Sequence, residues 1–154
     1  MKYIDNLQKV RSLDQKLVPF KKAAQVAFPQ GGWLKAIRTT LGMTSAQLAE
    51  RAKLSQPRIT QIEKKESSGQ LTLTTLQHLA SAMDLEFVYG FAPKYSLEEQ
   101  LKTQAKKIAV KRLNRMQHSM ELEKQGVSDK DKAAFLNKIV EELINELPKN
   151  FWTS

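Results

Sequence analysis

The stretch that decides the fold reads MTSAQLAERAKLSQPRITQIEKKE and occupies residues 43–66. It opens with Thr44 and Gln47 at the spacing of a capping box, in which the two side chains cap the start of one helix. After that helix only a tight connection precedes Ser55, a second N-cap candidate. Pro57 falls in the first turn of the following helix, where a missing N–H costs little. The stretch therefore predicts two short capped helices joined by a tight turn.

The two helices are expected to bury one face each and to expose the other. The residues predicted to fill the elbow between them are Leu48, Ala52, Leu54, Ile59 and Ile62, and the small Ala49 lets the helices approach closely. The outer face of the second helix carries Gln56, Pro57, Arg58, Thr60, Gln61 and Lys64, with Glu63 on the inner side. Gln can pair bidentately with adenine and Arg with guanine. This arrangement is the helix-turn-helix plan, whose second helix can lie in the major groove of DNA.

Helical periodicity extends over most of the remaining chain. Further helices are expected in an N-terminal segment broken by Pro19, from Trp33 to about Leu41, after Thr72, after Ser96 and after Ser128, with a loop over residues 66–70. Trp33 and Trp152 are expected to be core or near-core anchors. Gly31 and Gly32 suggest an alternative role for the helix that starts at Trp33, because they would let the N-terminus of this helix approach a phosphate.

One segment, residues 85–91, has the period of a β-strand and is rich in aromatic and β-branched residues. A lone strand leaves its backbone groups unpaired, so it needs a partner. Pairing across a two-fold axis would satisfy the strand and place two recognition helices about one DNA turn apart, ~34 Å. The residues of this dimer strand are Leu85, Phe87, Val88, Tyr89 and Phe91. The alternative is pairing with a segment of the same chain, near Tyr3 or Phe151.

The composition is that of a basic globular protein. Its 154 residues carry 25 Lys and Arg against 16 Asp and Glu, a formal net charge of +9, which suggests a polyanionic partner. Part of this charge forms a run along the expected long helix: Lys106, Lys107, Lys111, Arg112 and Arg115. The run is either a solvated face, a set of phosphate contacts beside the operator, or a docking surface for an acidic partner.

The composition also excludes several classes of protein. No apolar stretch approaches the ~18 residues of a membrane span and no signal peptide opens the chain, so we expect a soluble, cytoplasmic protein. There are no Cys and only two His, which argues against disulfides and a metal site. The chain lacks a Gly-rich phosphate loop and a nucleophile–base signature, so no enzymatic activity and no cofactor are expected.

Together with LTLTTLQHLASAMDLEF, residues 71–87, the opening stretch resembles the lambda-repressor-like, Cro/C1-type (XRE) helix-turn-helix family. The resemblance implies a mainly all-α fold: a lambda-repressor-like bundle with helical N- and C-terminal extensions and one short strand. It implies that bases are read by Gln56, Pro57, Arg58, Thr60 and Gln61, and that phosphates are contacted by Thr44, Ser45, Gln47, Lys64, Ser67 and Ser68. It also implies a structural ion pair between Arg38 and Glu63 that braces two helices.

Two positions depart from the family pattern. The family commonly has Gly in the turn, where this chain has Lys53. If the turn needs a positive φ, a residue with a Cβ costs roughly 1–2 kcal/mol there. Pro57 replaces a polar residue and can offer DNA only van der Waals contact.

The flanking stretches narrow the resemblance. PQGGWLKAIRTTLGMT, LEFVYGFAPKYSLEEQ and RMQHSMELEKQGVSD look like the bacterial mobile mystery protein A family, which implies a small regulator encoded beside a Fic-domain protein. The expected function is a dimeric repressor of its own operon, binding a palindromic operator in double-stranded DNA. The alternative is an antitoxin that neutralises the Fic-type enzyme directly. Fic-inhibiting antitoxins carry a Ser/Thr-x-x-x-Glu-Gly/Asn motif, and the nearest string, residues 119–124, lacks its last residue.

The expected organisation has four parts. Residues 1–28 form a helical extension, 29–84 the DNA-binding domain, 85–93 the dimerisation segment and 94–154 a C-terminal helical region.

Overall fold

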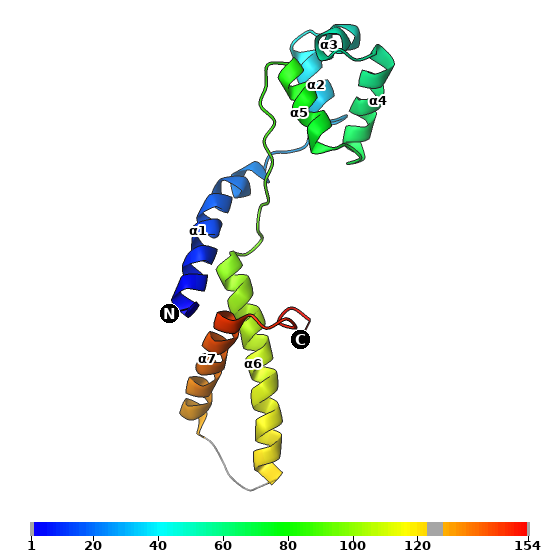
Figure 1. The fold of residues 1–154 in the computed structure, drawn as a ribbon. Helices are drawn as coiled ribbons and strands as arrows, with labels where there is room; N and C mark the ends of the chain where they lie inside the picture. Colours follow the sequence, from blue (N-terminus) through cyan, green and yellow to red (C-terminus); the bar gives the residue numbers. More distant parts are fainter. Residues whose placement is uncertain (1, 123–127, 154) are drawn as a thin grey trace. The chain divides into compact units, whose positions relative to one another are not determined.

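The computed structural model describes residues 2–122 and 128–153, and within these ranges the chain forms helices and no strand (Figure 1). The chain divides into two compact units. The central unit comprises Ala23–Gly90, and the terminal unit combines Met1–Lys22 with Phe91–Ser154. No helix in the described ranges is both long enough and apolar enough to cross a membrane.

The central unit is a bundle of four helices around one core. They are α2 (Trp33–Thr40), α3 (Ser45–Ala52), α4 (Gln56–Ser67) and α5 (Leu73–Ala82). The most deeply buried side chains are Leu48, Ile59, Ile62 and Leu79. The first three of these are elbow positions expected from the sequence, and Leu79 is contributed by α5. Burial of apolar area of this kind is the main force holding such a small unit together.

Local side-chain caps set where α3, α4 and α5 begin. The Thr44 hydroxyl accepts the Gln47 N–H at 3.1 Å, and the Gln47 side chain accepts the Thr44 N–H at 2.8 Å, which confirms the capping box. Ser55 caps α4 and Thr72 caps α5 in the same manner, by accepting an N–H three residues on. Gly42, at φ +68°, follows the end of α2, as expected for a stop signal.

The turn between α3 and α4 adopts the conformation that glycine favours. Lys53 lies at φ +55° and ψ +41°, in the left-handed region. Its own N–H bonds to the Glu50 carbonyl, and the Leu54 N–H bonds to the Ala49 carbonyl at 2.9 Å, which closes the end of α3. The turn geometry is therefore that of the helix-turn-helix plan, and Lys53 holds it at a conformational cost of roughly 1–2 kcal/mol.

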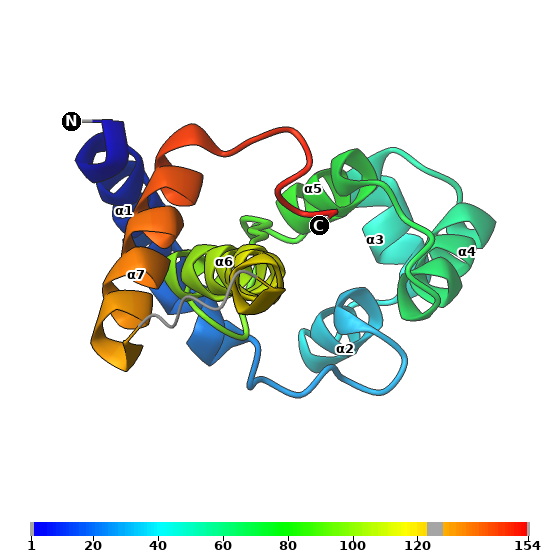
Figure 2. The ribbon, with the colours of Figure 1, turned by 90° about the horizontal axis from the view of Figure 1, so that it is seen from below.

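The terminal unit is built from α1 (Lys2–Ala23), α6 (Leu97–Leu122) and α7 (Asp129–Glu146), which lie together in Figure 2. The core residues of this unit are Leu7, Leu101, Ala105, Ile108, Ala109, Ile139, Leu143, Ile144 and Phe151. The Asp14 carboxylate of α1 accepts the N–H groups of Leu97 and Glu98 at 2.7 and 3.1 Å, and so caps α6. Ser96 and Ser128 cap α6 and α7, as expected.

Two expectations about the helices were wrong. Pro19 does not break the first helix, since α1 continues to Ala23. Proline removes only one N–H donor, and here just one further turn follows it before the helix ends. The loop expected at residue 66 begins later, because α4 runs through Ser67. Residues 123–127, which include the end of the antitoxin-like string, lie outside the described residues.

The two tryptophans are not core anchors either. Trp33 is 41% exposed and Trp152 is 60% exposed. In both cases the neighbouring residue occupies the buried position: Leu34 is 4% exposed and Phe151 is 2% exposed. At the start of α2 the buried residue is therefore Leu34, whereas Phe151 and Trp152 lie in the turns after α7.

The predicted β-strand is absent from the described ranges. Residues 85–91 are extended, but no second described segment pairs with them, so the backbone ladder of a sheet does not form. The side chains remain largely outside the core: Leu85, Val88, Tyr89 and Phe91 are exposed and Phe87 is half-buried, with its ring stacked on that of Tyr89. The period-two pattern correctly predicts an extended backbone, but a β-strand also requires a second strand with which to form hydrogen bonds.

Candidate nucleic-acid interface

The outward face of α4 carries the residues expected to read bases. Gln56, Pro57, Arg58, Thr60, Gln61 and Lys64 are all exposed, in agreement with the pattern of buried Ile59 and Ile62 between them. Within the described part of the chain, no side-chain hydrogen bond or ion pair engages Arg58, Gln61 or Lys64. These three groups are therefore available to a partner without breaking an intramolecular bond.

Both carboxylates of α4 point inward, away from this face. Glu63 is buried and pairs with Arg38 of α2. Glu66 turns toward the N-terminus of α2, where its two oxygens accept the Trp33 and Leu34 N–H groups at 3.1 and 2.9 Å. Because each acidic side chain is used inside the unit, the outward face presents only uncharged groups and cations, which suits a polyanion.

The Arg38–Glu63 pair joins α2 to α4 through two parallel hydrogen bonds. Arg38 Nε donates to Glu63 Oε1 at 2.6 Å, and the terminal Nη2 donates to Oε2 at 3.1 Å. The remaining nitrogen, Nη1, donates to the Met43 carbonyl at 2.9 Å. The hydrogen bond to Glu63 raises the pKa of Arg38, although burial opposes the shift. The pair thus fixes the angle at which α4 leaves the bundle.

Sequence reasoning missed Glu66, which changes the interpretation of the two glycines before α2. The helix N-terminus that could have received a phosphate already holds the Glu66 carboxylate. Gly32 lies at φ +96°, and a Cβ placed there would come within 2.5 Å of Glu66 Oε2. The glycine therefore serves the close approach of a carboxylate, and the phosphate alternative is wrong. The signal was available in the sequence, because Glu66 follows Ile59, Ile62 and Glu63 at inner-face spacing.

The first residue of the recognition helix is linked to the supporting helix. Gln56 Nε2 donates to the Ser45 hydroxyl at 3.0 Å, which joins the beginnings of α4 and α3. The carboxamide oxygen of Gln56 is left as a free acceptor in the described structure. The Thr60 hydroxyl donates to the Gln56 carbonyl at 3.3 Å, so its outward position is held by the helix itself.

The residues expected to contact phosphates fall at the two ends of this face. Thr44 and Gln47 are exposed and engaged in the capping box, with Ser45 half-buried beside them. The first turn of α3 still leaves N–H groups without intrahelical acceptors, an arrangement that favours phosphate. Ser67 and Ser68 are exposed at the other end, and the Ser68 hydroxyl donates to the Lys65 carbonyl at 3.0 Å.

The terminal unit carries the second basic surface. The five cations of α6, Lys106, Lys107, Lys111, Arg112 and Arg115, are all exposed. Within residues 2–122 and 128–153 no group of three or more His, Asp or Glu side chains is placed to hold a metal ion.

Comparison with known proteins assigns the central unit. Residues 34–89 match a family model described as "Helix-turn-helix", of the Cro/C1 (XRE) class. The match covers the four helices of the central unit and the extended segment after them. No curated protein and no solved structure matches the chain. The match supports a DNA-binding regulator. None of the matched residues belongs to the terminal unit.

Proposed function

We propose that this chain, which carries a Cro/C1-class helix-turn-helix domain at residues 34–89, is a sequence-specific regulator of transcription that binds double-stranded DNA as a dimer. The observation that carries the proposal is the outward face of α4. That face gathers exposed Gln and Arg side chains, while both carboxylates of the same helix are turned inward. A helix selected for solubility alone would have no reason to segregate its charges in this way.

Base recognition is assigned to Gln56, Arg58 and Gln61. Gln can bond adenine through both atoms of its carboxamide, and Arg can do the same with the acceptors of guanine. Each good bidentate contact contributes about 1–3 kcal/mol of discrimination. Pro57 supplies apolar contact, for example to a thymine methyl, and Thr60 flanks the readers.

Phosphate contacts are assigned to the two ends of the face, where they set the register of α4 on the duplex. The residues in this role are Thr44, Ser45, Gln47, Lys64, Ser67 and Ser68. Such contacts carry no sequence information, but they contribute affinity that falls as salt is raised.

Dimerisation is assigned to the extended segment Leu85–Phe91. Its side chains form an exposed apolar group, and large exposed apolar patches on a small unit are typical of interfaces. Pairing two copies of this segment would complete the missing ladder and present two recognition helices to a palindromic operator. Sedimentation at micromolar concentration tests this part, because a monomer there would contradict it.

The sequence resemblance to mobile mystery protein A supplies the finer hypothesis that the protein represses its own operon, which would include a gene for a Fic-domain protein. The alternative function, direct neutralisation of that enzyme, would use the terminal unit. Co-purification of the two proteins without DNA would favour the alternative, whereas loss of reporter expression from the operon promoter would favour repression.

The DNA-binding proposal is tested by selecting duplexes from a random pool with the purified protein. We expect an enriched palindromic sequence that binds at nanomolar concentration near physiological salt and resists competition by a scrambled duplex of equal length. Weak binding that is equal for both duplexes and disappears with salt would contradict the proposal, since it would reflect only the net charge of +9.

A further inference from the structure

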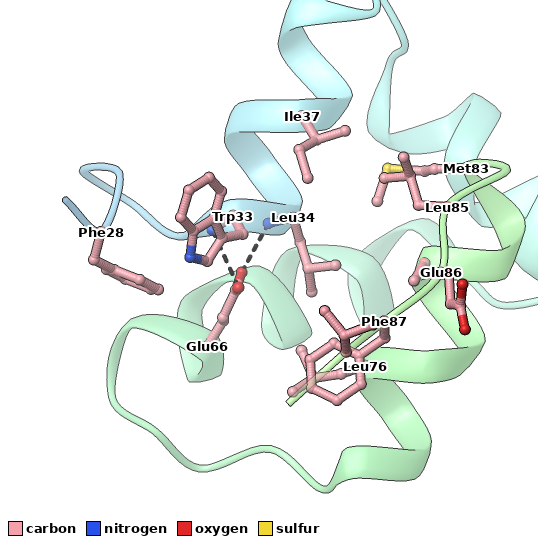
Figure 3. Close-up of a pocket in the computed structure, with 12 residues that line it drawn as sticks. Phe28, Trp33, Leu34, Ile37, Glu66, Leu76, Met83, Leu85, Glu86 and Phe87 are labelled. Atoms are coloured by element: carbon pink, nitrogen blue, oxygen red, sulfur yellow. Dashed lines mark hydrogen bonds between the residues drawn. The ribbon is translucent and has the colours of Figure 1, made fainter. Parts of the chain in front are cut away.

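A pocket of about 540 Å³ opens in the central unit, on a side of the bundle formed by α2, the end of α4, α5 and the extended segment after α5 (Figure 3). The residues that line it are Phe28, Trp33, Leu34, Ile37, Glu66, Leu76, Ala80, Met83, Leu85, Glu86, Phe87 and Val88. Its volume lies within the ~300–1,000 Å³ typical of small-molecule sites. None of the residues assigned to DNA contact lines it.

The wall is apolar and aromatic. Trp33 and Phe28 meet edge to face, with ring centroids 6.3 Å apart, and both rings remain about half exposed to water. Figure 3 shows Leu76 of α5 and Phe87 of the extended segment facing the pocket. Covering such rings is favourable, and an indole face additionally attracts a cation.

The charge of the wall is opposite to that of the protein. The chain carries +9 overall, yet the only charged side chains lining the pocket are two carboxylates, Glu66 and Glu86. Figure 3 shows the Glu66 carboxylate beside Trp33 and Leu34, whereas Glu86 points away from the Phe87 ring. An organic anion would therefore meet repulsion from these two carboxylates, since no Lys or Arg lines the pocket to compensate them.

The Glu66 carboxylate is held in a fixed position. Its two oxygens each accept one backbone N–H of α2, at 3.1 and 2.9 Å. A carboxylate has about four acceptor sites, so acceptor capacity remains for a ligand. A group that is already ordered loses little further entropy on binding, which favours affinity.

We propose that this pocket binds an apolar organic cation, an aromatic or hydrophobic amine whose ammonium group lies against Glu66 and whose apolar body covers Trp33 and Phe87. The site is separate from the DNA-contacting face of α4, and the proposal does not depend on DNA binding, although part of the pocket wall, residues 85–88, belongs to the segment to which dimerisation is assigned.

The test uses three probes that share one apolar body and differ in charge: phenylbutylammonium, phenylbutanol and phenylbutyrate. The two tryptophans belong to different units, so Trp152→Phe leaves Trp33 as the only indole, in the pocket wall. In this variant we expect a saturable change of Trp33 fluorescence, with the ammonium at least tenfold tighter than the carboxylate and the alcohol between them. In the matched variant Trp33→Phe, which retains Trp152, no saturable change is expected.

Two further variants test which of the two carboxylates causes the preference for the ammonium probe. Glu66→Gln is expected to reduce the preference for the ammonium at least fivefold, whereas Glu86→Gln, with the same change of charge, is expected to change it less than twofold. Because Glu66→Gln also disturbs the start of α2, Phe28→Lys serves as a second test: this lining side chain is 55% exposed and lies outside the proposed dimer segment, so the added cation should abolish ammonium binding in a folded protein. Absence of saturable binding, or equal binding of the ammonium and carboxylate probes, would overturn the proposal.

Discussion

Replacing Arg38 by alanine should destabilise the central unit more than any change on its surface. The substitution removes two hydrogen bonds to Glu63, at 2.6 and 3.1 Å, and one to the Met43 carbonyl at 2.9 Å. It also leaves the Glu63 carboxylate, only 8% exposed, without its cation. Removing one partner of a buried ion pair costs about 3–5 kcal/mol, because the remaining charge stays buried and unpaired. We expect the free energy of unfolding to fall by that amount.

The assay is urea denaturation of Trp152→Phe, in which Trp33 fluorescence reports the central unit alone. Asp84→Asn is the matched control. Asp84 pairs with Arg51 at 2.7 Å, but its carboxylate is 85% exposed, so this pair should contribute no more than about 1 kcal/mol. Asn also tolerates the φ of +59° at this position.

The double variant Arg38→Met, Glu63→Leu isolates the ionic contribution. Apolar residues of similar volume can replace a buried ion pair at little or no cost, so most of the lost stability should return. The reasoning is refuted if Arg38→Ala costs less than about 1 kcal/mol, or no more than Asp84→Asn, because the pair would then not brace α2 against α4.

Three other predictions concern single features of the fold. Lys53→Gly should raise the stability of the central unit by about 0.5–1 kcal/mol, since relief of the positive φ exceeds the entropy cost of glycine; no gain in urea denaturation would contradict this. Gly32→Ala should lower it by about 1–3 kcal/mol, because φ is +96° and the new Cβ would meet the Glu66 carboxylate; an unchanged midpoint would disprove that contact. The pKa of Glu98 is lowered from 4.5 to about 2, chiefly by the hydrogen bond from Arg11, so its ionised form stabilises the terminal unit above pH 4.5 and this contribution is lost as the pH falls toward 2. The stability advantage over Glu98→Gln should shrink across that interval, and a constant difference would count against the assignment.

The central unit was predictable because its signals are local. The Thr44–Gln47 box, the Ser55 cap and the spacing of Ile59 and Ile62 each specify a helix boundary or a buried face without reference to distant residues. Only the conformation of Lys53 required the whole motif, since a lysine gives no local signal for a positive φ.

The errors arose where a residue depends on a distant neighbour. The spacing of Glu66 after Ile62 and Glu63 indicates an inward side chain, but it does not show that this carboxylate caps α2, whose N–H groups lie 32 and 33 residues away. The segment after α5 has the composition of a strand, but a strand is defined by its partner, and none lies within the described residues. Periodicity alone does not show which of two adjacent apolar residues is buried, and at the start of α2 that residue is Leu34 and not Trp33.

The most direct test of the account compares Arg58→Ala with Arg112→Ala by fluorescence anisotropy on the selected operator and on a scrambled duplex. Both residues are exposed and both substitutions remove one positive charge, but only Arg58 lies on the outward face of α4. We expect Arg58→Ala to weaken operator binding by about 1–3 kcal/mol and to leave scrambled DNA nearly unaffected, while Arg112→Ala keeps the preference for the operator unchanged. Equal losses for the two variants on both duplexes would contradict the claim that α4 reads sequence.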